Sequence, residues 1–230
     1  MSARTTPVYL EVGNRRVFAG AVDWPGWCRS GKTEDAAVQS LLDYGPRYAA
    51  VISAATMRFA PPSDLSAFNV VERLKGDATT DFGAPGMAPS GDDEPLDKDD
   101  EQLVGGILQA CWAALDTAAQ AASGKELRKG PRGGGRGLNA IVAHVVDAES
   151  AYLRSVGGTF KLEERADLPT ESARLRAEIL DTLAARARGE PPPENSRRKA
   201  KPWTPRYFVR RTAWHALDHA WEIEDRTTTA

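Results

Sequence analysis

The hydrophobic pattern of this chain changes from strand-like to helical near residue 97, and this change places the strongest constraint on its fold. Before it, short β-type runs at residues 8–12, 16–24 and 68–74 flank a helical run that begins after Thr33. After it, apolar residues recur at steps of three and four, as they do on one face of a helix. The sequence therefore predicts the α+β class, with a small β-β-α-β unit followed by helices.

Four helices are expected in the second part, because residues typical of helix ends divide it into four stretches. Ser123 and Gly124 end the first stretch, and Gly189 ends the third. Thr170 is the expected N-cap of the third helix, and Pro205 opens the fourth. The expected helices cover residues 97–122, 138–156, 170–188 and 205–225. Four helices with one long connection predict an up-down four-helix bundle.

Residues 81–101, between the two parts, are rich in Gly, Pro and Asp. A segment of this composition has little apolar surface to bury and is typical of a linker. We therefore expect a domain at residues 1–80, a linker at 81–96 and the helical bundle at 97–230.

Composition and charge narrow the class of protein. The net charge of −2 provides no general attraction for nucleic acid, and no apolar run reaches the length of a membrane span. The first residues lack the apolar core of a signal peptide, and the two cysteines form no CxxC pair. We expect a reduced, cytoplasmic protein, with Cys111 in the core and Cys28 at the surface after a turn.

Two of the three histidines, His215 and His219, lie four residues apart on the fourth predicted helix. This helix is largely apolar, so both rings are expected to point inward on one polar stripe. His144 lies at the edge of the apolar face of the second predicted helix. Imidazoles at i and i+4 can converge on one ion, and facing helices of a bundle commonly build metal sites. We predict that the three residues bind one divalent metal ion, the alternative being ordinary hydrogen-bonded core histidines.

Four charged residues near these histidines are candidates for supporting roles. Asp147, Asp218 and Glu222 are close enough in sequence to accept a hydrogen bond from a ligating ring. Glu222 and Arg211 are also the candidates for a catalytic group beside the metal. The alternative for this pair is a salt bridge between them. Glu149 lies about 140° from His144 around its helix and is a poorer ligand.

The sequences AHVVDAE around His144 and HALDH at 215–219 resemble the DinB/YfiT-like metal-binding superfamily, over about residues 97–226. The resemblance implies a four-helix bundle that holds a divalent metal through His144, His215 and His219, with open positions for water. Zinc or nickel is the first expectation, with manganese and iron as alternatives. Some members are thiol-dependent transferases or isomerases that use mycothiol, bacillithiol or glutathione, and many have no known activity. Because related bundles often pair, we expect a homodimer.

The first part of the chain is similar to HicB-like antitoxin domains over about residues 7–75. The similarity rests on PGWCRSGKTEDAA, in which Pro25, Gly26, Gly31, Thr33 and Ala37 have the spacing of that family. It implies a small unit for pairing or binding rather than for chemistry. A hairpin and one helix bury little area alone, so this unit is expected to pack on the bundle or on a second copy.

Together these features predict a divalent-metal protein whose site is open to a small-molecule ligand or a thiol. Its enzymatic form is a metal-dependent hydrolase or a thiol-dependent transferase. The alternative is a non-catalytic binding or stress-response module with a structural metal. Residues 197–211 are basic and aromatic, and we expect them to line the mouth of a cleft that receives an anionic cofactor, rather than to bind nucleic acid.

Overall fold

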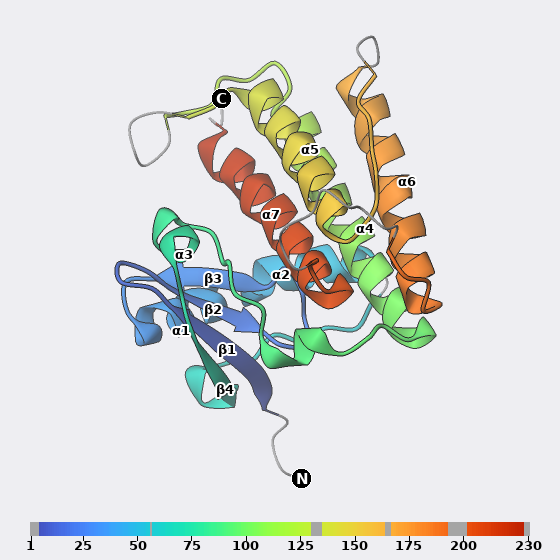
Figure 1. Cartoon of the computed structure of the whole chain (residues 1–230). Helices are drawn as coiled ribbons and strands as arrows, with labels where there is room; N and C mark the ends of the chain where they lie inside the picture. Colours follow the sequence, from blue (N-terminus) through green and yellow to red (C-terminus); the bar gives the residue numbers. More distant parts are fainter. Residues whose placement is uncertain (1–4, 56, 130–134, 164–166, 193–201, 228–230) are drawn as a thin grey trace.

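The computed structural model describes residues 5–55, 57–129, 135–163, 167–192 and 202–227. A four-stranded sheet comes first and long helices follow, so the predicted α+β class is confirmed (Figure 1). In chain order the elements are β1 (Thr6–Val12), β2 (Val17–Ala21), β3 (Cys28–Gly31), α1 (Glu34–Asp43), α2 (Gly45–Ala54), η1 (Leu65–Ala67), β4 (Phe68–Lys75), α3 (Ala78–Phe82), η2 (Ser90–Asp93), α4 (Lys98–Ala121), α5 (Leu138–Ser155), α6 (Leu168–Ala187) and α7 (Pro205–Arg226).

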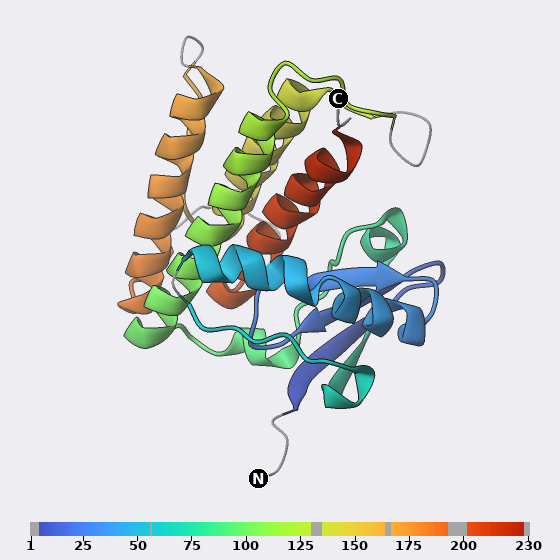
Figure 2. The same ribbon diagram turned by 180° about the vertical axis from the view of Figure 1, so that it is seen from behind.

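The sheet has the strand order β3-β2-β1-β4. Strands β1 and β2 form the predicted hairpin, which Gly13 closes by donating its backbone N–H to the Arg16 carbonyl at 2.9 Å. Strand β4 pairs with β1 in parallel, and such a pair requires a crossover connection. Helices α1 and α2 lie in that crossover; α1 covers one face of the sheet, and α2 continues from it to pack against α4 (Figure 2).

The first unit has one strand and one helix more than the predicted β-β-α-β pattern. Strand β3, with the sequence CRSG, has no apolar alternation and exists because its backbone pairs with β2. Helix α1 ends at Asp43, just before Gly45 and Pro46, and the chain then continues as the second helix, α2. Thr33 caps α1 as predicted, because its side chain accepts a hydrogen bond from the Ala36 N–H.

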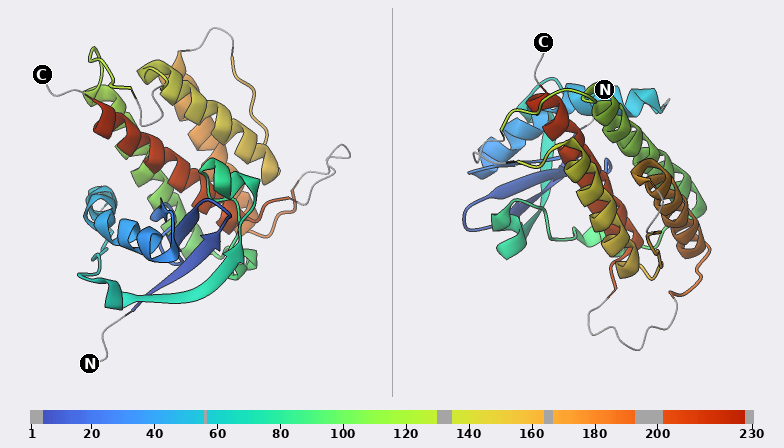
Figure 3. Two further views of the ribbon diagram at one scale, coloured as in Figure 1. Left: turned by 90° about the vertical axis from the view of Figure 1, so that its left-hand side faces the viewer. Right: turned by 90° about the horizontal axis from the view of Figure 1, so that it is seen from above.

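The four long helices lie where the sequence predicts them and pack around one another. Helix α4 contacts α6 and α7, and α5 contacts the same two helices (Figure 3, right). The prediction that Thr170 caps α6 was wrong. Asp167 caps it instead, because a proline at the start of a helix lets the helix begin two residues earlier. No helix in the part of the chain that the structure describes is long and apolar enough to cross a membrane.

One continuous cluster of buried residues joins the sheet to the long helices. It includes Val8 and Leu10 of β1, Trp27, Leu108 of α4 and Phe208 of α7. Helix α7 lies between the sheet and helices α4 and α5 (Figure 1). The first unit therefore packs on the helices of its own chain, which is one of the two expected arrangements.

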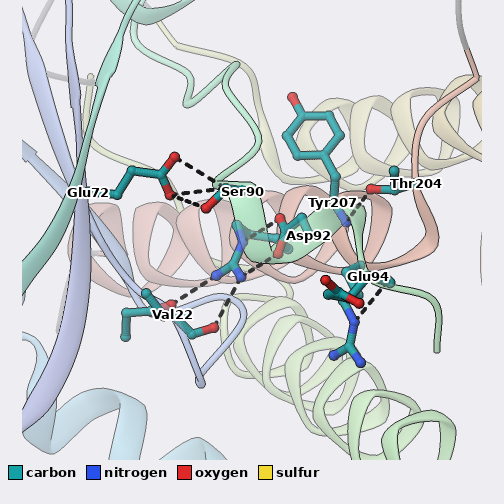
Figure 4. A network of polar contacts seen from close by, with 10 residues as sticks. Val22, Glu72, Ser90, Asp92, Glu94, Thr204 and Tyr207 are labelled. Atoms are coloured by element: carbon teal, nitrogen blue, oxygen red, sulfur yellow. Dashed lines mark hydrogen bonds and ion pairs between the residues drawn. The ribbon is translucent and has the colours of Figure 1, made fainter. Parts of the chain in front are cut away.

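The prediction that residues 81–101 bury little was wrong. This segment crosses the face of the sheet opposite α1, and four of its residues are buried, Pro85, Pro89, Asp92 and Leu96. Asp92 forms a bidentate ion pair with Arg210 of α7, at 2.7 and 2.8 Å. The same guanidinium donates to the carbonyl oxygens of Ala21 and Val22 at the end of β2, as Figure 4 shows for Val22. One side chain thus ties together α7, the sheet and the segment that resembles a linker.

A second buried carboxylate holds the same segment. Glu11 of β1 is fully buried and accepts hydrogen bonds from the Thr80 hydroxyl and from the backbone N–H groups of Gly86 and Met87. Closer to η2, the half-buried Glu72 accepts hydrogen bonds from Ser90 (Figure 4). Sequence composition could not predict these contacts, since they depend on which residues of distant elements face one another.

We predict that Arg210→Met destabilises the protein by about 3–5 kcal/mol, because it leaves the Asp92 carboxylate buried without its partner. Urea unfolding at pH 7 measures this change. The control is Arg73→Met, which removes the exposed Arg73–Glu34 ion pair and is expected to cost less than about 1 kcal/mol. Equal effects of the two substitutions would contradict the role assigned to Arg210.

Candidate metal site

The three histidines come from α5 and α7, which pack against each other. His215 and His219 lie one turn apart on α7 and are buried, and His144 of α5 is half-buried. Their ring centroids are 5.1 Å apart for His144 and His215, 5.2 Å for His144 and His219, and 4.7 Å for His215 and His219. The structure therefore brings together the three residues that the sequence singles out.

Each ring offers one nitrogen atom to a common point. The three nitrogen atoms lie within 4.8 Å of one another. The ligand atoms of a tetrahedral zinc site lie about 3.3 Å apart, so small side-chain rotations would bring the nitrogen atoms into range of one ion. Among the described residues, no Cys, Asp or Glu belongs to this group. The set therefore consists of three imidazoles.

A carboxylate fixes the orientation of one of the three rings. Nδ1 of His219 lies 2.8 Å from Oε2 of Glu222, one turn further along α7. Because a carboxylate accepts, the neutral ring carries its proton on Nδ1, which leaves the lone pair of Nε2 for a metal. The hydrogen bond from His219, followed by that from Arg226, lowers the pKa of Glu222, so Glu222 stays charged.

Arg226 extends this chain of contacts to the loop between α4 and α5. Its guanidinium donates to Oε1 of Glu222 at 2.6 Å and to the carbonyl oxygens of Arg128 and Arg136 at 2.8 and 3.0 Å. The partner of Glu222 is therefore Arg226, and the predicted alternative of a salt bridge between Glu222 and Arg211 was wrong. Arg226 is one turn from Glu222 on the same face of α7, whereas Arg211 lies eleven residues away, about 16 Å along the helix axis, and is too far to form this ion pair.

The other two acidic candidates do not hold a ligating ring in the structure. Asp218 points away from the histidines and forms an ion pair with Arg29 of β3 at 3.0 Å. Asp147 is exposed, and its charge partly counteracts the lowered pKa of His144. Among the described residues, only Glu222 hydrogen-bonds a histidine of the group.

A second indication that the site takes a ligand comes from His215. Its Nδ1 is buried and has no hydrogen-bond partner among the described residues. A buried polar atom without a partner costs about 1–3 kcal/mol, so such atoms call for a ligand. Burial, followed by the charge of His219 and then that of Arg211, lowers the pKa of His215 well below its usual value. The ring is therefore neutral at pH 7, as a metal ligand must be.

Two aromatic rings lie beside the histidines, and the charge of Arg136 acts on them. Tyr152, two turns after His144 on α5, has its ring centroid 5.8 Å from that of His215, and the Trp214 ring lies 6.1 Å from it. The positive charge of Arg136 lowers the pKa of both His144 and His215. Sequence analysis missed Tyr152 and Arg136, although the spacing of eight residues between His144 and Tyr152 already places both on one face of α5.

Two expectations about other residues are settled by burial. Cys28 is not at the surface as predicted but is buried where β3 packs on α7, and burial raises the pKa of its thiol to about 12. Cys111 lies in the core as predicted.

Trp203 and Tyr207, of the basic and aromatic run at residues 197–211, pack against each other with ring centroids 4.8 Å apart. Residues 197–201 of this run lie outside the described residues.

Glu149, the buried acid of α5, faces away from the histidines. It accepts a hydrogen bond from Nε1 of Trp112 on α4 at 2.9 Å. Burial raises its pKa to about 7, against the opposing effects of the Arg176 charge and the Trp112 hydrogen bond. Its place in the structure agrees with its exclusion as a ligand.

These features define a helical protein with a group of three histidines that could hold a divalent metal ion. A family model described as the DinB superfamily matches residues 107–223, just over half of the chain. The chain therefore belongs to the DinB superfamily, whose members often bind metal. A search of curated proteins and a search of solved structures each found no match.

We predict that the titration of Glu149 lowers the free energy of unfolding of the protein as the pH rises from about 4.5 to 7. In this window the folded state keeps the proton of Glu149, because its pKa is raised to about 7, whereas the unfolded state has lost it. Glu149→Gln removes this dependence. The unfolding free energy of the wild type is expected to fall relative to Glu149→Gln by roughly 2–4 kcal/mol between pH 4.5 and 7.5.

Urea unfolding at several pH values measures this difference. Comparing the two proteins at each pH cancels the titration of the histidines, which both of them contain. Asp181→Asn, on the exposed face of α6, is the control and is expected to leave the pH profile unchanged. A constant difference between wild type and Glu149→Gln would show that Glu149 titrates normally.

Proposed function

We propose that this protein binds one divalent metal ion through His144, His215 and His219 and presents the open positions of the ion to a small ligand. The observation that carries the proposal is the convergence of three imidazole nitrogen atoms within 4.8 Å. The unpartnered, buried Nδ1 of His215 supports it, because a metal would satisfy that atom. The Glu222 carboxylate supports it further, because ligating histidines commonly donate their other N–H to such a group.

The donor set favours zinc or nickel. Imidazole nitrogen suits zinc, nickel, copper and iron, whereas manganese prefers carboxylate and carbonyl oxygen. Manganese and iron therefore remain the alternatives. Such an ion would supply positive charge that stabilises the deprotonated form of a water molecule or a thiol.

An open site favours catalysis over a structural role. Structural zinc sites have four protein ligands, whereas catalytic sites have three and leave a position for water or substrate. Here three protein ligands are present among the described residues, and the half-buried His144 leaves the group accessible. The enzymatic form of the proposal is a metal-dependent hydrolase or a thiol-dependent transferase of the mycothiol, bacillithiol or glutathione type.

The competing proposal is a non-catalytic binding or stress-response module with a structural metal. Glu222 has its two oxygen atoms bonded to His219 and Arg226, so it orients a ligand and is not a free general base. Arg211 is the remaining polar candidate beside the metal. A screen of low-molecular-weight thiols with an electrophile distinguishes the two proposals: metal-dependent turnover supports the transferase, and its absence supports the module.

Five further expectations stay proposals. The mutual contacts of α4 to α7 support an up-down four-helix bundle, and the division at residues 1–80, 81–96 and 97–230 stays a prediction. The similarity of the first unit to HicB-like domains would make it a unit for pairing or binding. A homodimer and a cytoplasmic location complete the proposal.

We predict about one metal ion per chain in protein purified without a histidine tag, measured by elemental analysis. The double substitution His215→Ala/His219→Ala removes two of the three ligands and is expected to abolish that metal, with helical content monitored by circular dichroism. Gln102→Ala, on the exposed face of α4, is the control and should keep it. Metal retained by the double variant would refute the proposed site.

We also predict that Glu222→Ala weakens metal binding by about 10- to 100-fold, because His219 loses the acceptor that orients its ring. Glu222→Gln, which keeps an acceptor oxygen, is expected to have a smaller effect. The matched control is Glu224→Gln, two residues along the same helix, where the carboxylate pairs with Arg47 on another face. Competition with a chelator measures the affinities, and equal affinities for Glu222→Ala and Glu224→Gln would exclude the orienting role.

A further inference from the structure

The seam between α5 and α7 continues beyond the three histidines. His144 lies level with His215 and His219, and Tyr152 lies level with His215 and Arg211, so the two helices run in opposite directions along the seam. Between His144 and Tyr152, on the same face of α5, the residue is Ala148, which is small and half-buried. The next charged group along the seam, on α7, is the guanidinium of Arg211.

Arg211 differs from the other arginines of α7 that have partners in the structure. Arg206 pairs with Asp100, Arg210 pairs with Asp92 and Arg226 pairs with Glu222. Arg211 is half-buried and forms no ion pair with any carboxylate of the described residues. A half-buried guanidinium without an acidic partner is a ready site for an anion.

The contacts of Arg211 hold its charge in place. Its NH1 donates to the Pro85 carbonyl oxygen at 2.6 Å, which uses only part of its donor capacity. Its guanidinium carbon lies 4.9 Å from the Trp214 ring centroid and 5.5 Å from that of Tyr152. On the side of the sheet, the space bounded by Arg211, Tyr207 and Trp214 measures about 10 Å³, which holds no more than a water molecule. A ligand larger than water would therefore have to approach Arg211 from the side of the seam, where its guanidinium faces the Tyr152 ring.

Aromatic rings continue from Arg211 toward the end of the seam. Tyr152 and Trp203 have centroids 5.2 Å apart, and Trp203 and Tyr207 have centroids 4.8 Å apart. Tyr152 and Trp203 are only half-buried. Flat apolar surface next to an unpaired cation suits a ligand that combines an anionic head with an apolar body.

We infer that Arg211 binds the carboxylate of a small aromatic or apolar organic acid whose body lies against Tyr152 and Trp203, beside the histidine group. A carboxylate matches the planar guanidinium with two parallel hydrogen bonds, which a point-like anion cannot do. The positive charge of a metal ion at the histidines and that of Arg136 favour the same anionic head. The inference rests on the proposed function, because it assigns the ligand class of that site.

The test measures binding of benzoate, benzamide, acetate and inorganic phosphate to metal-loaded and metal-free protein by calorimetry. Benzoate is expected to bind most tightly, since benzamide lacks the charge, acetate lacks the aromatic body and phosphate lacks both the planar head and the apolar body. Arg211→Met is expected to weaken benzoate binding by about 10- to 100-fold. Arg211→Lys, which keeps the charge without the planar donors, is expected to be intermediate.

A matched control and a second variant separate the two parts of the ligand. Arg154→Met removes a cation from the same end of α5, where Arg154 bonds Ser150, and is expected to leave benzoate binding unchanged. Tyr152→Ala is expected to weaken benzoate while leaving acetate unchanged. Benzamide binding as tightly as benzoate, or equal benzoate affinity in wild type and Arg211→Met, would overturn the inference. Tighter binding of phosphate than of benzoate would also overturn it, in favour of an inorganic anion.

Metal content measured on each variant distinguishes this inference from the proposed function. Arg211→Met is expected to keep its metal, since Arg211 is not a ligand. Wild-type protein without metal would refute the proposed function, whereas benzoate binding to the metal-free protein through Arg211 would still support the assigned anion site. Metal present in every variant, with no effect of Arg211→Met on benzoate, would refute the inference alone.

Discussion

Helix α7 lies between the sheet and the other long helices, and 15 of its 22 residues are buried. A helix in this position cannot leave its polar side chains in water, so each of them needs a partner within the protein. Arg210 pairs with Asp92 and donates hydrogen bonds to the carbonyl oxygens at the end of β2. Asp218 pairs with Arg29. Arg226 pairs with Glu222 and donates to two loop carbonyl oxygens. These contacts tie the sheet, the segment after β4 and the loop after α4 to a single helix.

Three polar groups of α7 are exceptions among the described residues. Two of them, on His215 and Arg211, lie one turn apart on the same side of the helix, and the third is the buried hydroxyl of Thr212, which has no hydrogen-bond partner. Nδ1 of His215 has no hydrogen-bond partner, and Arg211 forms no ion pair with a carboxylate, among the described residues. A buried polar group without a partner lowers the stability of the fold, so a ligand that satisfies it is favoured. We propose that a metal ion satisfies the His215 nitrogen and that an anionic ligand binds the Arg211 guanidinium. Glu149 shows the contrasting case, in which a buried acid is tolerated by keeping its proton at a raised pKa of about 7.

The contact chain from His219 through Glu222 and Arg226 to the loop carbonyls links the metal site to a part of the chain far from it in sequence. On the other side of α7, the hydrogen bond from Arg211 to Pro85 links the site to the segment that crosses the sheet. The sheet and the segment that crosses it therefore help to position the helix that carries His215 and His219, although they contribute none of the three histidines.

The sequence alone determined the α+β class, the four long helices and the identity of the three histidines, because these follow from local periodicity and from the rarity of histidine in the chain. It did not reveal strand β3, whose residues CRSG become a strand only by pairing with β2. The expectations for residues 81–101 and for Cys28 were also wrong. Composition shows how much apolar surface a segment has, but not which other elements of the fold cover that segment. Helix geometry already excludes an ion pair between Arg211 and Glu222, eleven residues apart on α7, and favours Arg226, one turn away. Only the tertiary structure decided that the carbonyl oxygens of Arg128 and Arg136 hold Arg226 in place, because they belong to a loop far away in the sequence.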